Sequence, residues 1–284
     1  QVGTIVSGII SADMTWDTAG SPYIVVGDVT VMVGTTLTIA PGVEVRFGEG
    51  RKLVVQGQLV AEGTSTERIL FTRQATTGYW GRIELTDSPS GFLSVQYADV
   101  EHSLGGIHIE ARSPSPDVIT RISHSRFRFN RKAISAFAFD RVVNRIDISY
   151  NEFSQNNSAD GFMVAVQDKT DVHHNTFSAN VATWMLAVFN DANIENNLIY
   201  GNHGTGVRLD FPTGSFRYNT IVANRVDGVV GAMQADSAHT GAIASENNIY
   251  GNGGYAWRAH SVSSLTFTAA NNYWGTTDQT LINA

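Results

Sequence analysis

Apolar and polar residues alternate along most of this chain, with the period of β-strands. In Gly206-Val-Arg-Leu-Asp210 the apolar residues sit two apart, and Gly106-Ile-His-Ile-Glu110 repeats the arrangement. A period of two marks strands that are buried on one face, whereas an amphipathic helix needs apolar residues three and four apart. The pattern therefore predicts an all-β protein.

A six-residue unit, Asn-x-apolar-x-x-Asn, recurs through the second half of the chain. Complete copies begin at Asn151, Asn175, Asn197, Asn219 and Asn247, and half-units lie at Phe127–Asn130 and Asn271–Tyr273. Successive central apolar residues are 26, 24, 22, 22, 28 and 24 positions apart. Self-similarity at this period indicates a solenoid. A leucine-rich repeat would need several leucines per unit, which this sequence lacks.

A β-helix explains why the recurring residue is asparagine. Coils that stack about 4.8 Å apart place equivalent residues directly above each other. A column of asparagines can then pass amide hydrogen bonds from coil to coil, and asparagine tolerates the left-handed backbone of tight turns. The apolar residue of each unit is expected to point into the core. We predict about eleven coils, forming a rod roughly 50 Å long.

The chain resembles the parallel β-helix repeats of the pectate-lyase-like superfamily. The repeated units and the closing Ala270-Asn-Asn-Tyr-Trp-Gly275 carry part of this resemblance. The N-terminal third resembles the opening coils of secreted bacterial members, in Leu37–Phe47, Leu53–Leu59, Ile69–Thr72 and Trp80–Ile83. The resemblance implies a right-handed single-stranded parallel β-helix and a secreted or cell-surface location. These are fold motifs, and the superfamily includes lyases, hydrolases, esterases, epimerases, adhesins and phage spikes.

The 284 residues show no break in composition, so residues 1–284 are expected to form one β-helix domain. Residues 1–25 are the expected N-terminal cap. At the other end, residues 276–284 either form a short cap or lead into a longer native chain. Gln1 is an unusual natural start and indicates a processed or trimmed chain. Uncovered sheet edges would favour end-to-end or homo-oligomeric association.

Composition removes several classes of partner and site. The chain has no cysteine, which excludes disulfides, thiolate metal sites and cysteine nucleophiles. Charged residues make up 16% and the net charge is −7, so bulk charge does not support binding of nucleic acid. No apolar run reaches membrane-spanning length, so no membrane insertion is expected.

A row of aspartates is the first candidate for chemistry. Asp140, Asp168, Asp191 and Asp236 each follow an alternating apolar strand. In stacked coils some of these carboxylates would lie close together, and adjacent anions need solvent or a bridging cation. Ca²⁺ suits such oxygen ligands, and the resemblance implies a use for Ca²⁺ beside a uronate substrate. The alternative interpretation, which we favour, is that each aspartate starts a turn.

The outward side chains of the strands form the second candidate site. Arg208 and Asp210 point outward where Val207 and Leu209 point inward, and this pair is the candidate catalytic group. His108 and Glu110 occupy the same positions on another strand and are candidates for binding substrate. A glycoside hydrolase needs two carboxylates, whereas the resemblance implies that a lyase of this fold uses a basic Arg or Lys. The alternative is a surface ion pair of little consequence.

Aromatic and histidine residues complete the candidates. Tyr255 and Trp257 are candidate sugar-stacking platforms, while Trp80 is expected to fill the core beneath Ile83. His173 and His174 are adjacent in a predicted strand, so their side chains should point to opposite faces. We therefore assign no transition-metal site.

Two functions follow from these patterns. The first is an extracellular β-helix that binds a polysaccharide along its lateral sheet, as a polysaccharide lyase or glycoside hydrolase. The second is a rod without an active site, in an adhesive, cell-surface or filament protein. The lengths of the coils favour the rod, because the longest exceed 22 residues by only four to six, which is too short for deep walls around a groove.

Overall fold

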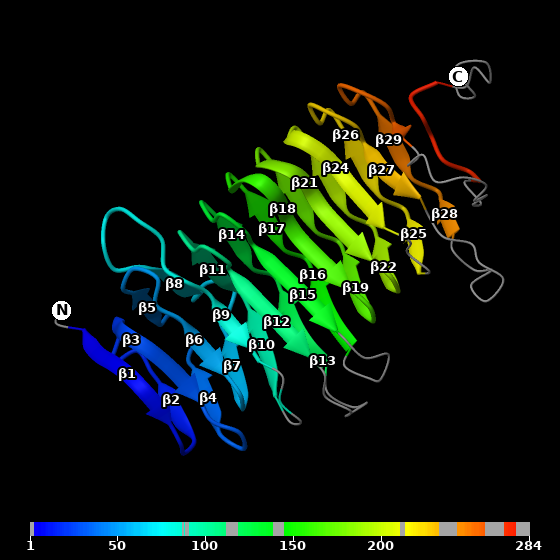
Figure 1. Ribbon diagram of the computed structural model, residues 1–284. Helices are drawn as coiled ribbons and strands as arrows, with labels where there is room; N and C mark the ends of the chain where they lie inside the picture. The colour runs from blue at the N-terminus through cyan, green and yellow to red at the C-terminus, as the bar shows by residue number, and fades with distance from the viewer. Residues whose placement is uncertain are drawn as a thin grey trace.

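The chain forms an all-β parallel solenoid whose coils stack from one end of the molecule to the other (Figure 1). The computed structural model describes residues 3–86, 88, 91–111, 119–138, 145–210, 214–232, 243–258 and 270–276. These residues form thirty strands and no helix. Every recorded strand pair is parallel, as the alternating pattern and the repeat period predict.

Each coil contributes strands to three faces. The lateral face consists of β6 (Leu53–Val55), β9 (Ile83–Leu85), β12 (Ile107–Ala111), β15 (Ile134–Ala138), β18 (Asn157–Gln167), β21 (Val181–Phe189), β24 (His203–Asp210), β27 (Val229–Ala232) and β30 (Trp257–Arg258). The short-strand face consists of β5 (Glu44–Phe47), β8 (Ile69–Arg73), β11 (Ala98–Glu101), β14 (Arg126–Arg128), β17 (Glu152–Ser154), β20 (Thr176–Ser178), β23 (Leu198–Tyr200), β26 (Thr220–Val222) and β29 (Asn248–Tyr250).

The third face is a separate ten-stranded sheet. It consists of β2 (Met14–Trp16), β4 (Thr36–Ile39), β7 (Gln58–Glu62), β10 (Phe92–Gln96), β13 (Ile119–Ser123), β16 (Arg145–Ser149), β19 (Thr170–His173), β22 (Ala192–Glu195), β25 (Ser215–Arg217) and β28 (Ile243–Ser245). The first coils are joined differently, because β1 (Thr4–Ile10) and β3 (Tyr23–Val31) each run through both of the other faces.

The described residues make about nine turns, fewer than the eleven predicted. One reason is that the early coils are longer than the shortest repeats. Val45 pairs with Phe71, 26 residues further along, and Phe71 pairs with Val100, 29 residues further. The prediction also counted the whole chain, whereas the last strand described ends at Arg258.

The core is one continuous cluster of buried apolar side chains, which stack in columns along the axis of the solenoid. The central residues of the repeats stack inside it, with ring centroids 5.1 Å apart for Phe127 and Phe153 and 4.5 Å apart for Phe153 and Phe177. Ile199 and its two successors continue this column, and all are buried. Trp80 is fully buried and stacks on Phe47 at 4.3 Å, which confirms its predicted place in the core.

Buried asparagines line both corners of the short-strand face. One column contains Asn151, Asn175, Asn197, Asn219 and Asn247, and the other contains Asn130, Asn156, Asn180, Asn202, Asn224 and Asn252. Oδ1 of Asn180 accepts hydrogen bonds from the backbone N–H and the side-chain Nδ2 of Asn156, at 3.0 and 2.9 Å. Nδ2 of Asn180 donates to the carbonyl oxygen of Phe153 at 2.8 Å. The side chain of Asn180 therefore satisfies two backbone groups of the preceding coil, which would otherwise be left buried without partners and destabilise the fold.

The last coil departs by one residue from the predicted register. Asn272, not Asn271, continues the column, because its Oδ1 accepts from the N–H of Asn247 at 2.9 Å. Tyr273 then pairs with Asn248 and is exposed, while Trp274 packs against the core. The sequence Asn271-Asn272 fits two frames, and the prediction chose the wrong one.

The predicted N-terminal cap, residues 1–25, overlaps the first strands of the stack. β1 pairs with β3 and β2 pairs with β4, both in parallel. The side chains of Ile5 and Ile9 are each 70% exposed on β1. This part of the described chain thus continues the strand pattern of the coils that follow it.

A left-handed residue precedes each asparagine of the first column, and it overturns one prediction. His174 has φ 56° and comes directly before Asn175. Because this conformation ends the strand alternation, His173 and His174 turn to the same side, with their Nδ1 atoms 2.9 Å apart. The prediction that the two rings point to opposite faces is wrong.

Candidate functional site

The outward side chains of the lateral face form columns whose chemistry changes along the axis. One column reads Glu84, His108, Ser135, Ala165, Ala187, Arg208, Val230 and Arg258. The next column reads Glu110, Phe137, Gln167, Phe189 and Asp210. The charged residues and His108 therefore lie toward the two ends, and uncharged residues separate them.

The candidate catalytic pair lies together on β24. Nη2 of Arg208 is 2.7 Å from Oδ2 of Asp210, and both side chains are partly buried. The guanidinium also stacks on the ring of Trp184, with Cζ 4.4 Å from the ring centroid. These two contacts hold Arg208 in one orientation at the surface, because ion pairing and cation–π attraction act on the same flat group.

The predicted substrate-binding pair of His108 and Glu110 occupies the same two columns as Arg208 and Asp210. Nε2 of His108 lies 3.1 Å from Oε1 of Glu110. Four strand steps separate β12 from β24, which corresponds to roughly 19 Å at the spacing of stacked strands. The structure therefore places the two predicted pairs on one face but does not bring them into one site.

A tight ion network surrounds Glu84, one coil before His108. Its carboxylate is 2.8 Å from Nη2 of Arg82 and 3.2 Å from Nζ of Lys52. Hydrogen bonds from Arg82, and then from Lys52, lower the pKa of Glu84 to about 2, although burial opposes this shift. At this end of the face the single carboxylate of Glu84 is therefore shared by two cations, Arg82 and Lys52.

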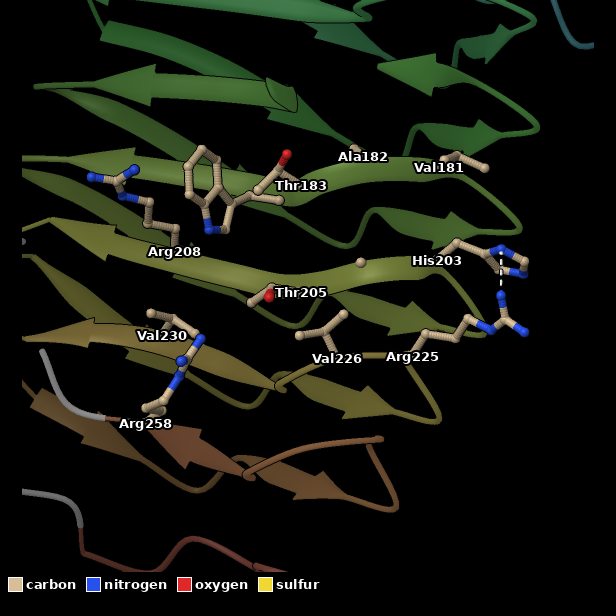
Figure 2. A pocket seen from close by; sticks show the side chains of 12 residues that line it. Val181, Ala182, Thr183, His203, Thr205, Arg208, Arg225, Val226, Val230 and Arg258 are labelled. Atoms are coloured by element: carbon tan, nitrogen blue, oxygen red, sulfur yellow. Dashed lines mark hydrogen bonds between the residues drawn. The ribbon is translucent and has the colours of Figure 1, made fainter. Parts of the chain in front are cut away.

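A cavity opens on the lateral face between β21 and β30 (Figure 2). It has a volume of about 630 Å³, within the range of small-molecule and sugar sites. Its apolar part is formed by Trp184, Val226 and Val230 together with Val181 and Ala182. Residues from four successive coils line it, so the cavity is elongated along the stack rather than confined to one turn.

The ionisable side chains that line this cavity are three arginines and one histidine. Arg208 and Arg258 lie on one side, and His203 and Arg225 lie on the other (Figure 2). Among the described residues that line it, none is Asp or Glu. The cavity is thus a local concentration of positive charge on a chain whose net charge is −7.

The arginines of the cavity differ in whether they already form an ion pair with a carboxylate. Nη2 of Arg258 is 2.6 Å from Oδ2 of the buried Asp227. Nη1 of Arg225 instead lies 3.4 Å from Nδ1 of His203 and has no carboxylate partner in the described part of the chain. Arg225 is therefore the cation most available to an anionic ligand.

The two aromatic candidates occupy different environments at the C-terminal coils. The side chain of Tyr255 is 65% exposed. Trp257 pairs with Val229 in a core-facing column and packs edge-on against Phe216 and Trp274, at 6.0 and 6.4 Å between centroids. Trp184, which the sequence analysis did not select, is the tryptophan that faces the cavity.

Of the predicted aspartate row, Asp168 and Asp191 lie on adjacent coils. Asp140 and Asp236 lie outside the described residues. Oδ1 of Asp168 accepts a hydrogen bond from the N–H of Asp191 at 3.4 Å, and Nζ of Lys169 is 3.2 Å from Oδ2 of Asp191. No group of three or more acidic or histidine side chains in the described ranges is arranged around a common point. Calcium binding here stays a prediction, and thermal melting with and without a chelator measures it.

The residues that sequence reasoning missed share a simple signal. His203 and Arg225 each directly follow an asparagine of the second column, and aligning the repeats on that column places His203 directly above Val181 and Arg225 in the next coil. Arg258 lies two coils above Arg208, because Arg208 pairs with Val230 and Val230 pairs with Arg258. Candidate residues were selected from the sequence within single strands, so a site whose residues come from four coils was not identified.

Comparison with solved structures shows the same fold. A mutant of the periplasmic alginate epimerase AlgG matches with a TM-score of 0.51 and 12% identity, over 92% of this chain and 84% of that chain. The A-module of the mannuronan C-5 epimerase AlgE6 from Azotobacter vinelandii matches with a TM-score of 0.43 and 13% identity, over 92% and 72% of the two chains. At this level of identity the likeness concerns the fold alone.

A curated relative matches a shorter stretch. Protein bark beetle of Drosophila melanogaster is 38% identical over 80 residues, which is 28% of this chain. The chain spans only 2% of the length of that relative. Within the described residues, no helix is long and apolar enough to span a membrane.

A family model described as the right handed beta helix region matches residues 105–273. The matched segment includes both asparagine columns and every strand that lines the cavity. It covers more than half of the sequence, and it agrees with the parallel pairing and the stacked core of the structure. The chain therefore belongs to the right-handed β-helix family.

Proposed function

We propose that this β-helix binds an acidic polysaccharide, a chain containing uronic acid sugars, in the cavity between β21 and β30. The observation that carries the proposal is the lining of that cavity, which combines three arginines and a histidine with a tryptophan ring and contains no carboxylate among its described residues. Cations recognise the sugar carboxylates, and the apolar surface accommodates the sugar rings.

The arginines suit a carboxylated ligand better than a neutral one. A guanidinium offers a planar pair of N–H donors that matches a carboxylate. Arg208 is fixed in place by Trp184 and Asp210, so little side-chain freedom is lost when it binds. Arg225 has no competing carboxylate in the described residues, so an anion at this position gains a full ionic partner.

The spacing of the arginines supports a ligand that runs along the axis of the solenoid. Arg208 and Arg258 belong to one column, with Val230 between them. Two strand steps correspond to about 9.6 Å. An extended polysaccharide lying across the coils would therefore meet two guanidiniums about 9.6 Å apart, whereas one lying along a single strand would meet only Arg208.

The fold comparison is consistent with this ligand class. AlgG, whose structure shares the fold, is described as an alginate epimerase, and alginate is an acidic polysaccharide. That protein is also described as periplasmic, which agrees with the secreted or cell-surface location that we propose for this chain.

Cleavage of the polysaccharide is the second candidate function. The observation in its favour is the pairing of Arg208, which lines the cavity, with Asp210, since a base beside a bound uronate could remove a proton. Binding is better supported, because Arg208 is committed to Asp210 and Trp184 and no carboxylate is among the described residues that line the cavity.

Calorimetric titration with oligouronates and with neutral oligosaccharides of equal length tests the proposal. We expect binding of the oligouronates only, with an affinity that falls as salt concentration rises. Arg225→Ala should weaken binding about tenfold or more, because a charged hydrogen bond contributes about 1.5–3 kcal/mol. Trp184→Ala should weaken it about fivefold.

Arg46→Ala is the matched control, because it removes the same charge from the short-strand face, where Arg46 pairs with Glu44. Equal loss of affinity in Arg46→Ala and Arg225→Ala would contradict a local site. The same samples, followed by the absorbance of unsaturated products and by reducing ends, test cleavage. Activity that survives both Arg208→Ala and Asp210→Ala would exclude this pair as the catalytic group.

A further inference from the structure

The adjacent residues His173 and His174 form a pair of imidazoles outside the cavity of the lateral face, at the corner between the ten-stranded sheet and the short-strand face. His173 ends β19 of the ten-stranded sheet, and His174 is the left-handed residue at the following corner. Their Nδ1 atoms are 2.9 Å apart, and their rings meet edge to face with centroids 5.2 Å apart. This contact is a hydrogen bond in which one ring nitrogen donates and the other accepts, so two ring nitrogens face each other at an accessible surface.

The neighbours of this pair hold both rings in place. The ring of His174 stacks on Tyr150 at 4.7 Å, and the ring of His173 meets the edge of Tyr150 at 5.8 Å. Tyr150 is in turn stacked on His124 at 5.0 Å, in a column of rings that follows the corner. The orientation of the two imidazoles is therefore fixed by packing before any ligand arrives.

A carboxylate behind His173 selects its proton position. Nε2 of His173 lies 3.2 Å from Oδ1 of Asp147, and Oδ2 of Asp147 accepts a hydrogen bond from Nε of Arg121 at 3.3 Å. Oδ1 of Asp147 is buried and has no well-aligned hydrogen bond in the described structure. A proton on Nε2 of His173 would satisfy it after a small ring rotation, leaving a lone pair on Nδ1. Metal-binding histidines commonly show this arrangement with a carboxylate.

The separation of the two nitrogens fits a chelated metal ion. With metal–nitrogen bonds of about 2.0–2.1 Å, nitrogens 2.9 Å apart subtend about 90° at the metal. That angle belongs to neighbouring ligands in square-planar or octahedral coordination, the geometries of Cu²⁺ and Ni²⁺. A tetrahedral ion would require the rings to move apart.

Oxygen donors lie one coil above the two histidines. Glu195 pairs with His173 across the sheet, and Asn196 occupies the corner position above His174. All four residues line one polar pocket of about 360 Å³. No three acidic or histidine side chains among the described residues surround one point, so a metal ion at this pair would take two protein ligands directly and the rest from water.

We propose that His173 and His174 chelate a divalent transition-metal ion through their Nδ1 atoms, with Cu²⁺ bound more tightly than Ni²⁺. Asp147 is a positioning residue that orients His173, and Glu195 contacts the ion through water. The site is separate from the polysaccharide cavity, so either proposal can fail without the other.

Titration with NiCl₂ and electron paramagnetic resonance of the Cu²⁺ complex test this site. The variants use residues that the chain itself places in the same columns: His174→Asn copies Asn196, and His173→Ser copies Ser149. We expect each to weaken Ni²⁺ binding at least about tenfold. Asp147→Asn should weaken it about 10- to 100-fold with both imidazoles still present. The Cu²⁺ spectrum should show two coupled nitrogens in the native protein and one in either histidine variant.

His124→Asn is the matched control, because His124 belongs to the same ring column and also has a left-handed backbone but has no neighbouring histidine. It should leave Ni²⁺ affinity unchanged. Equal weakening by His124→Asn and His174→Asn, or a Cu²⁺ spectrum unaltered by His173→Ser, would overturn the proposal. Circular dichroism of each variant confirms that the β-fold is retained.

Discussion

The asparagine corners and the lateral face are built on the same coils, yet they use their columns in opposite ways. At the corners one residue type recurs on successive levels, and the copies from Asn130 to Asn247 are buried and hydrogen-bonded to their neighbours. On the lateral face the outward column changes from Glu84 through small residues to Arg208 and Arg258. Uniform columns hold the coils together, whereas variable columns place different chemistry at different heights.

This difference assigns stability and binding to separate residues. A buried column is shared by several coils, so damage to one member removes contacts on both sides. An outward side chain on the lateral face makes most of its contacts within its own strand or with one neighbour. Substitutions in the two regions should therefore produce opposite patterns of lost stability and lost affinity.

The largest effect is expected in the core, at Phe153. Phe153→Ala removes a ring that is stacked between Phe127 and Phe177 and leaves a cavity in the middle of the column. We expect the free energy of unfolding to fall by about 3–5 kcal/mol, measured by chemical denaturation. Leu198→Ala, at a partly exposed position of the short-strand face, should change it by less than about 1 kcal/mol. Similar losses at the two sites would contradict the comparison.

Asn180→Ala should cause the second largest loss of stability. The substitution leaves the N–H of Asn156 without its acceptor and the carbonyl of Phe153 without its donor, both inside the structure. We expect a loss of about 2–4 kcal/mol in the free energy of unfolding. Asn193→Ala is the control, because that asparagine is exposed and bonds Asp171 at the surface. A neutral result at Asn180 would show that the corners are not what joins the coils.

Arg208→Ala should lower affinity for the ligand strongly and stability only slightly. The ion pair with Asp210 and the stacking on Trp184 are partly solvated, so stability should fall by only about 1 kcal/mol. Affinity for oligouronates should fall about tenfold or more. Paired denaturation and calorimetric titrations of one sample distinguish the two quantities. A large loss of stability without loss of affinity would place Arg208 with the structural residues.

The smallest effect concerns pH and Glu84. Its pKa in the folded protein is lowered to about 2 by Arg82 and Lys52. The ionised carboxylate therefore stabilises the fold fully above its ordinary pKa of 4.5, and this contribution disappears as the pH falls toward 2. Glu84→Gln should be less stable than the native protein at pH 7, and the difference should shrink between pH 4.5 and pH 2. A difference that is constant across this range would show that the charge is not responsible.

Much of the fold could be predicted from the sequence because its signals are local and repeated. The alternation around Val207 and Leu209 identified a strand, and the spacing of the asparagines identified the stack. The exceptions come from short-range ambiguity. From the sequence alone, Asn271 and Asn272 fit the asparagine column equally well. His174 has a left-handed backbone because it occupies the same corner position as Tyr150 and Asn196, and this equivalence is seen only when the coils are aligned.

The candidate site was less predictable because its parts lie on different coils. Arg208 and Asp210 could be paired from their own strand, and the structure brings them together. Trp184, Arg225 and Arg258 are separated from them by roughly one or two coils of sequence, and no single repeat contains the group. Irregular pairing within β21 and β24 also shifts Trp184 opposite Thr205, which simple counting from the asparagines does not reproduce.

The division of the cavity among four consecutive coils restricts how this protein can change over evolutionary time. Duplication or loss of a whole coil between His108 and Trp184 would leave every wall of the cavity intact, because each coil contacts only its immediate neighbours. The same event between β21 and β30 would pull Arg208 and Arg258 apart or press them together. Relatives that retain the ligand should therefore vary in length on the N-terminal side of Trp184 and keep a constant number of coils beyond it.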